Sequence, residues 1–219
     1  MIFQDRREAG RALARALRGL PDLDDAVVLA LPRGGVPVAF EVARELRLPL
    51  DVFVVRKLGV PGQEELAMGA VASGGMVVLN APVVRGFGIA QEVIDAAVAR
   101  EQQEIAHREA AYRAGRPSLP LEGRTAILVD DGLATGSTMI AAVRALRPVA
   151  RQVIAAVPVA AARSCELVRR EADQFVCLAL PHLFSAVGEF YHNFDPTGDD
   201  VVRSLLAASQ NDGDAPRAA

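Results

Sequence analysis

Residues 125–147 read TAILVDDGLATGSTMIAAVRALR, which places an apolar run, a polar loop and a second apolar stretch in direct succession. The run that ends at Val129 is typical of a strand buried on both faces, and the stretch after Gly136 is typical of the helix that follows such a strand. Two neighbouring acids, Asp130 and Asp131, stand at the end of the strand. Because adjacent carboxylates repel each other and lose hydration when buried, they predict a ligand that requires negative charge.

The succession of strand and helix recurs along the chain. Apolar runs predict strands at 26–32, 50–56, 76–80, 125–131, 151–160 and 173–180, and helices are predicted at 4–18, 36–47, 89–114, 136–147, 162–171 and 198–208. This order indicates an α/β fold with a doubly wound parallel sheet and right-handed crossovers. We expect one domain over residues 1–208 and a disordered polar tail over 209–219.

Two segments are expected to stand apart from this sheet. Residues 58–75 contain five glycines, a proline and two acids, and they predict a mobile hairpin or lid rather than core. Residues 181–196 collect aromatic side chains after the last strand. The long charged helix at 89–114 is expected to cover a sheet face or to reach a partner subunit.

Bulk composition limits the possible partners. A net charge of −3 over 219 residues argues against a broad nucleic-acid face. The chain opens with no basic-then-apolar signal and has no uncharged apolar run of about 18 residues, so we expect a cytoplasmic protein without a membrane span. Cys165 and Cys177 lack the spacing of a metal site and are expected to be free thiols. Only Lys57 among the 24 basic residues is a lysine, which makes it conspicuous.

The candidate ligand-binding residues stand directly after predicted strands. Ligands of open parallel sheets bind beyond the carboxyl ends of the strands, and Arg33, Lys57 and the acid pair each follow a predicted strand. The alternative for Arg33 is a surface residue in a tight turn.

The loop after the acid pair suits a phosphate. Small residues let backbone amides approach an anion, and the start of a helix adds partial positive charge. The segment lacks the GK[ST] ending of a Walker A loop, and the chain lacks a GxGxxG fingerprint. The carboxylates then suit hydroxyl groups or a cation, so a sugar phosphate such as ribose 5-phosphate fits both features. The alternative is that the acids only cap the turn.

Three motifs carry a family resemblance. VDDGLATGST resembles the phosphoribosyl pyrophosphate (PRPP) motif of type I phosphoribosyltransferases, LPRGG at 31–35 resembles their pyrophosphate loop, and VVRKLG at 54–59 resembles the segment before their catalytic loop. The motifs occur in family order, and the resemblance covers roughly residues 20–195, closest to a bacterial group of uncharacterised members. It implies a Rossmann-like sheet with a flexible lid at about 58–75 and a small C-terminal hood at about 181–196. It also implies dependence on Mg²⁺ and a homodimer.

The resemblance also assigns roles to individual residues. Asp130 and Asp131 would bind the ribose hydroxyls, directly or through Mg²⁺ waters, while Lys57 and Arg56 would neutralise the departing pyrophosphate. Arg33 and its neighbours would bind the pyrophosphate across a cis peptide bond at Pro32–Arg33. The residues expected to contact the two phosphate groups are Ala134, Thr135, Gly136, Ser137 and Thr138 for the 5-phosphate, and Arg33, Gly34 and Gly35 for the pyrophosphate.

The lid and the hood leave alternatives open. Glu64 and Glu65 could act as an acid/base or a Mg²⁺ contact, or could only keep the lid soluble. Phe184 or Tyr191 could stack on an acceptor base, whereas neighbouring phenylalanines could simply close the core. The resemblance therefore implies transfer of phosphoribose from PRPP to a nucleobase-like acceptor with release of pyrophosphate. The alternative is a regulatory protein that keeps the fold and senses nucleotides.

Overall fold

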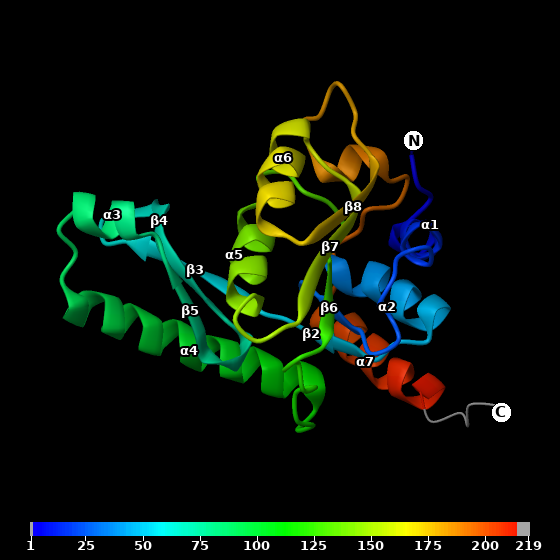
Figure 1. Ribbon diagram of the computed structural model, residues 1–219, viewed down its shortest axis with the longest axis horizontal. Coiled ribbons are helices and arrows are strands. Elements are labelled where there is room, and N and C mark those ends of the chain that lie inside the picture. The colour runs from blue at the N-terminus through cyan, green and yellow to red at the C-terminus, as the bar shows by residue number, and fades with distance from the viewer. Residues whose placement is uncertain (1, 214–219) are drawn as a thin grey trace.

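A five-stranded parallel sheet forms the centre of the structure, a computed structural model in which residues 2–213 are described (Figure 1). The strand order is β2-β1-β6-β7-β8, and every neighbouring pair is parallel. The strands are β1 (Val27–Ala30), β2 (Leu50–Val52), β6 (Thr125–Val129), β7 (Gln152–Val159) and β8 (Gln174–Ala179). From β1 the chain adds β2 on one side and β6, β7 and β8 on the other. The topological switch point therefore lies between β1 and β6.

Helices cover both faces of this sheet, as a doubly wound fold requires. One face packs against α1 (Arg6–Leu17), α2 (Gly35–Leu46) and α7 (Asp199–Gly213), and the other packs against α5 (Ser137–Leu146) and α6 (Ala162–Glu171). Alternate residues of β1 point to opposite faces, so Val28 joins the first core and Leu29 joins the second. The predicted α/β fold is confirmed.

A second, antiparallel sheet extends to one side of the molecule (Figure 1). It contains β3 (Val55–Val60), β4 (Gln63–Ala72) and β5 (Met76–Leu79), and it is followed by α3 (Ala81–Gly86) and α4 (Gln91–Arg113). We call residues 55–113 the arm. Leu58 and Met68 of the sheet are buried against Ile94 and Ile105 of α4, which gives the arm its own apolar core.

The arm corrects three expectations. The strand predicted at 50–56 is in fact two elements, because β2 ends at Val52 and β3 belongs to the other sheet. Phe53 and Val54 are both buried, but they join different cores, so the apolar run gives no sign of the break. The hairpin predicted within 58–75 is present, but the expectation that it lies outside any core is wrong. The strand predicted at 76–80 is β5, and it is antiparallel.

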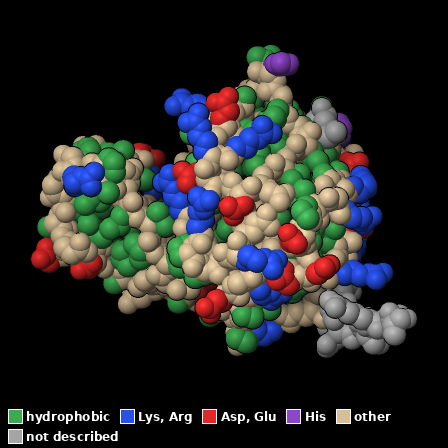
Figure 2. Space-filling model, in the orientation of Figure 1, with side chains coloured by type: hydrophobic (Ala, Val, Ile, Leu, Met, Phe, Trp, Pro, Cys, Tyr) green, Lys and Arg blue, Asp and Glu red, His purple; other side chains and the backbone are tan. Residues whose placement is uncertain are grey.

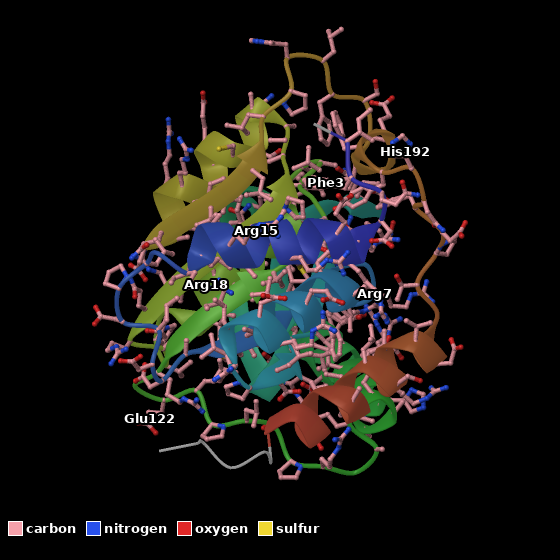
Figure 3. All side chains as sticks on the ribbon, turned by 90° about the vertical axis from the view of Figure 1, so that its right-hand side faces the viewer. Phe3, Arg7, Arg15, Arg18, Glu122 and His192 are labelled. Carbon is pink, nitrogen blue, oxygen red and sulfur yellow. The ribbon has the colours of Figure 1, made fainter. Side chains whose placement is uncertain are left out.

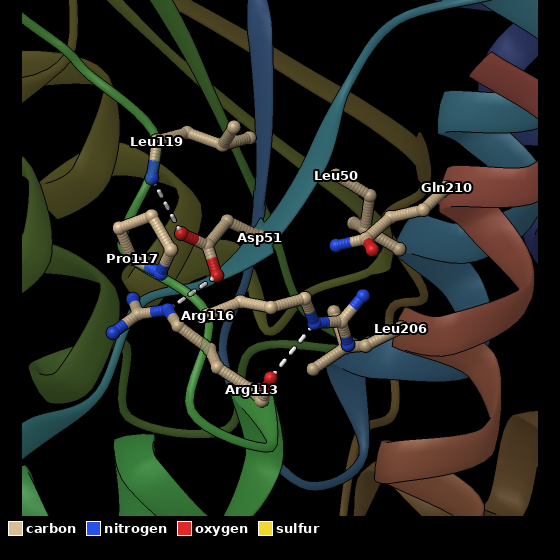
Figure 4. A pocket seen from close by; sticks show the side chains of 8 residues that line it. All are labelled: Leu50, Asp51, Arg113, Arg116, Pro117, Leu119, Leu206 and Gln210. Carbon is tan, nitrogen blue, oxygen red and sulfur yellow. Dashed lines mark hydrogen bonds and ion pairs between the residues drawn. The ribbon is translucent and has the colours of Figure 1, made fainter. Parts of the chain in front are cut away.

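A buried ion pair anchors the arm to the main sheet (Figure 4). Arg113, the last residue of α4, donates from Nε to Oδ1 of Asp51 in β2 at 2.8 Å, and the other carboxylate oxygen accepts from the amide of Leu119. The cavity beside them measures about 30 Å³, which is room for little more than a water molecule. This cluster is therefore a structural joint rather than a ligand site.

The C-terminal helix is longer than predicted. We expected a helix at 198–208, but α7 continues to Gly213, so the expectation of a disordered tail is wrong for residues 209–213. The rest of the predicted tail, 214–219, lies outside the described residues. Within residues 2–213, no helix is both long enough and apolar enough to span a bilayer.

Candidate active site at the switch point

The acid pair and the LPRGG turn meet at the switch point between β1 and β6. The amide of Leu31 donates to the carbonyl of Val129, which keeps the two chains together beyond the ends of their strands. A side chain on Gly34 would collide with Oδ2 of Asp131, and one on Gly35 would lie 2.6 Å from the carbonyl oxygen of Val129. The two glycines therefore allow the turn to lie directly against the acids. The Pro32–Arg33 peptide bond is cis, as the resemblance implied.

Asp131 is held by two other segments of the chain. Arg6, the first residue of α1, donates from Nε to Oδ2 of Asp131 at 2.8 Å. The hydroxyl of Tyr191 donates to the backbone carbonyl of Asp131 at 2.6 Å. The N-terminal segment and the hood are also joined by backbone hydrogen bonds. The amide of Phe3 donates to the carbonyl of Phe190, and the carbonyl of Phe3 accepts from the amide of His192 (Figure 3).

Burial makes the acid pair electrostatically costly. It raises the pKa of Asp130 well above the ordinary value for aspartate, and the negative charge of Asp131 raises that pKa further. Burial also raises the pKa of Asp131, although the hydrogen bond from Arg6 opposes that shift. A ligand that brings hydroxyl donors or a cation to this pair would relieve the cost.

The loop after the acids ends at the start of a helix. Gly136 has a φ of 76° and is the N-cap of α5, so the chain turns there in a conformation that favours glycine. Thr135, Ser137 and Thr138 are exposed, and the hydroxyl oxygens of the first two lie 3.2 Å apart. The hydroxyl of Ser164 donates to the carbonyl of Ala134 at 2.5 Å and fixes the base of the loop. Three exposed hydroxyl residues thus lie beside the N-terminus of α5, an arrangement suited to a phosphate.

Arg33 lies at the rim of this site, where it meets α7. Its guanidinium lies 3.9 Å from Oδ1 of Asp199, and both side chains are about half exposed. The same carboxylate oxygen accepts a hydrogen bond from the buried Tyr112 at 3.0 Å. Arg33 is therefore available to a ligand, with Asp199 as its partner in the structure described.

The expected cationic and acidic residues of the lid lie in the arm. Arg56 pairs with Glu101 of α4 at 2.9 Å, and Lys57 Nζ lies 3.3 Å from Oε2 of Glu65. Glu64 accepts from the amide of Gly62 in the β3–β4 turn. Their roles stay predictions, but the expectation that Lys57 ends a strand of the main sheet is wrong, because β3 belongs to the second sheet.

The hood contains a correction. We expected Tyr191 or Phe184 to stack on an acceptor, but Tyr191 is only 6% exposed and its ring packs between Phe3 and Phe194. Tyr191 therefore has a structural place, with its hydroxyl on Asp131. Phe184 is partly exposed and stacks on Phe190 with ring centroids 5.6 Å apart, so its role as an acceptor contact stays a prediction.

A known protein family matches the part of the chain that contains this site. The family model described as "Phosphoribosyl transferase domain" matches residues 4–195, which include every candidate residue described above except the α7 residue at the rim. The chain belongs to the phosphoribosyltransferase family.

Two curated relatives and one solved structure resemble the chain over nearly its whole length. Proteins MT0597 and Rv0571c from two strains of Mycobacterium tuberculosis, both provisionally named phosphoribosyl transferases, are each 48% identical over 212 residues, or 96% of this chain. The alignment covers 48% of each relative, so the chain spans about half the length of the curated relatives it matches. The crystal structure of TT1426 from Thermus thermophilus is 42% identical, with a TM-score of 0.86, and the match covers 95% of this chain and 99% of that one.

Sequence reasoning missed two residues that contact the candidate site. Arg6 and its neighbour Arg7 are both arginines of the same helix, and nothing in the local sequence indicates that only Arg6 contacts the acids. Asp199 begins a helix that lies beyond the family-matched residues. Both reach the site only through contacts between segments far apart in the chain, so no local signal could have found them.

Proposed function

We propose that the protein is a Mg²⁺-dependent phosphoribosyltransferase that transfers 5-phosphoribose from PRPP to a nitrogenous base and releases pyrophosphate. The observation that carries the proposal is the convergence of Asp130 and Asp131 with the N-terminus of α5 and with the close approach of Gly34 and Gly35 at one switch point. PRPP has a matching order of groups: a phosphate, then vicinal hydroxyls, then a diphosphate.

Each group of PRPP has a candidate partner. The loop from Ala134 to Thr138 would receive the 5-phosphate through amides and hydroxyls. The acid pair would accept hydrogen bonds from the ribose hydroxyls. The turn at Arg33, Gly34 and Gly35 would receive the diphosphate, because amides and a guanidinium suit phosphate oxygens.

The donor set fits Mg²⁺ that arrives with a phosphorylated substrate. Within the described residues, no group of three or more His, Cys, Asp or Glu side chains could hold a metal by itself. Mg²⁺ is usually held by one or two carboxylates together with substrate phosphates, and Asp130 and Asp131 supply two carboxylates. When bound, Mg²⁺ would neutralise charge on the diphosphate leaving group.

The chain's own residues would contribute to the displacement in two ways. Loss of pyrophosphate leaves positive charge on the ribose ring, and the fixed carboxylates at the switch point favour that charge. Lys57 and Arg56 would reach the leaving group by movement of the hairpin, which would also exclude water. Lys57 is free to do so in energetic terms, because its partner Glu65 is fully exposed and such surface pairs contribute little.

A homodimer is part of the proposal. Val77, Leu79 and Phe87 of the arm are each at least 40% exposed, and Figure 2 shows apolar side chains gathered over this part of the surface. An exposed apolar surface of this kind favours a protein contact. Sedimentation analysis of the wild type and of Phe87→Ser would test it.

The decisive experiment is a titration with PRPP in the presence and absence of Mg²⁺. We expect binding that needs Mg²⁺ and that weakens at least tenfold in Ser137→Ala/Thr138→Ala, while a matched change of an exposed hydroxyl on α7, Ser204→Ala, has no effect. Absence of binding by the wild type would refute the proposal.

A panel of purine and pyrimidine bases, scored by pyrophosphate release, then separates an enzyme from a sensor. Turnover with any base that slows strongly in Lys57→Ala supports catalysis. Tight PRPP binding without turnover over the whole panel favours the regulatory alternative.

A further inference from the structure

We infer that Arg6 is a positioning residue of the PRPP site, which fixes the Asp131 carboxylate against the LPRGG turn and balances one of the two adjacent negative charges. This inference rests on the proposed function, because it assigns Arg6 to the binding of the anionic donor. It adds to the site a residue from the N-terminal helix, more than 100 positions away in sequence from the acids.

The guanidinium of Arg6 is built into the site from three sides. Its Nε donates to Oδ2 of Asp131 at 2.8 Å, and its Nη1 donates to the carbonyl of Asp195 at 2.9 Å. The face of the guanidinium lies 3.9 Å from the centre of the Phe194 ring. The Arg6 side chain is 11% exposed and that of Asp131 is 14% exposed. Charged groups are rarely buried to this degree unless they are paired, so each holds the other in place.

This contact divides the two oxygens of Asp131 between different tasks. Oδ2 is the oxygen that accepts from Arg6, and it is also the oxygen that a side chain on Gly34 would displace. Oδ2 is therefore enclosed between α1 and the LPRGG turn, which leaves Oδ1 as the oxygen free for a substrate hydroxyl. Asp130 is oriented separately, because its Oδ1 accepts the amide of Asp131 at 2.8 Å.

Charge balance gives the contact a second consequence. PRPP carries a phosphate and a diphosphate, so an uncompensated pair of carboxylates would repel it. Arg6 reduces the formal charge of the pair from −2 to −1 without occupying the loop at Ala134–Thr138. A carboxylate held by a guanidinium can still accept a hydroxyl group through its other oxygen.

The neighbouring arginines of α1 show what a surface role looks like. Arg7 is 52% exposed and points to Glu41 of α2 at 3.7 Å, and Arg15 lies exposed further along the helix (Figure 3). Arg6 belongs to the same helix and carries the same charge, but it turns inward to the acids. Its burial therefore follows from its position and not from its residue type.

The test compares Arg6→Gln, Arg6→Lys and the matched control Arg15→Gln in the full chain. Calorimetric titration with Mg²⁺ and PRPP is expected to show affinity at least tenfold weaker for Arg6→Gln, partial recovery for Arg6→Lys, and no change for Arg15→Gln. Inorganic phosphate serves as a second probe. Because it can occupy the helix N-terminus without the acids, its affinity is expected to stay within about twofold in all variants.

The outcomes separate this inference from the proposed function. No PRPP binding by the wild type overturns both. Binding by the wild type with equal affinity in Arg6→Gln overturns the inference alone, as does an equal loss of phosphate and PRPP binding, which would indicate a general structural defect. If Arg6→Gln does not fold, the folded variant Arg6→Lys decides the question. Wild-type PRPP affinity in Arg6→Lys would mean that the paired hydrogen bonds from Nε and Nη1 are not needed, which overturns the inference. A loss of PRPP affinity without a loss of phosphate affinity supports it.

Discussion

Replacing Asp130 by Asn should stabilise the ligand-free protein and at the same time abolish its affinity for PRPP. Asn keeps the Oδ1 acceptor for the amide of Asp131 and has nearly the same shape. It removes the buried charge and the repulsion from Asp131, the two causes that raise the pKa of Asp130. A ligand-binding acid of this kind lowers stability in exchange for function, so its removal is expected to raise stability.

The expected gain is about 0.5–2 kcal/mol in the free energy of unfolding, the range usual for relief of one unfavourable group. In a domain of this size each kcal/mol raises the melting temperature by roughly 2–4 °C. Asp131→Asn is the matched comparison and is expected to give a smaller gain. Burial raises the pKa of Asp131 as well, but the hydrogen bond from Arg6 opposes that shift and is lost in this variant.

Urea unfolding of the two variants and the wild type checks the expected order of stability, and PRPP titration checks the loss of affinity. The effect should also depend on pH. Since the pKa of Asp130 is raised in the folded state, the folded protein holds this proton more tightly than the unfolded chain. The loss of stability caused by the Asp130 charge is fully present above the folded-state pKa and disappears as the pH falls toward the ordinary value of 3.8. The difference in free energy of unfolding between Asp130→Asn and the wild type should therefore become smaller on acidification. A loss of stability in Asp130→Asn at neutral pH would refute the reasoning.

Three further predictions concern the arm and the rim. Glu101→Gln should lower the free energy of unfolding by about 1 kcal/mol at neutral pH. Burial raises the pKa of Glu101, but hydrogen bonds from Arg56 and Arg100 outweigh burial and lower the pKa overall. Urea unfolding should therefore show the stability difference between variant and wild type vanish as the pH falls below 4.5. Leu58→Ala, at a site 1% exposed, should cost about 2–5 kcal/mol by the same measurement. Asp199→Asn should change the free energy of unfolding by less than about 1 kcal/mol. It should nevertheless tighten PRPP binding two- to threefold, measured by calorimetry, because Arg33 loses its carboxylate partner. Unchanged PRPP affinity would contradict this prediction.

The site was predictable to the extent that its parts are local. The acids, the glycine loop and the helix start lie within twelve residues, and the LPRGG turn directly follows a strand. Because the carboxyl ends of adjacent parallel strands meet at one edge, the strand order alone brings these two segments together. Their roles as ligands stay predictions.

The arm was less predictable, because a run of apolar residues reports burial but not which core receives it. Residues 50–56 read as one strand, yet Phe53 and Val54 belong to two different cores and the chain passes from one sheet to the other between them. Lys57 was consequently expected at the end of a main-sheet strand and lies instead in an antiparallel hairpin.

The sequence by itself determined the alternation of strands and helices and the pair of acids beside a phosphate-type loop, because periodicity and turn chemistry act over a few residues. Only the tertiary structure decided which charges offset each other. Arg6 and Arg7 are identical in type and adjacent in sequence, but one neutralises Asp131 beneath the Phe194 ring and the other lies half exposed beside Glu41. The physical reason is that Coulomb energy and burial depend on distances in space, and those distances come from the packing of α1 and the hood against β7 and β8.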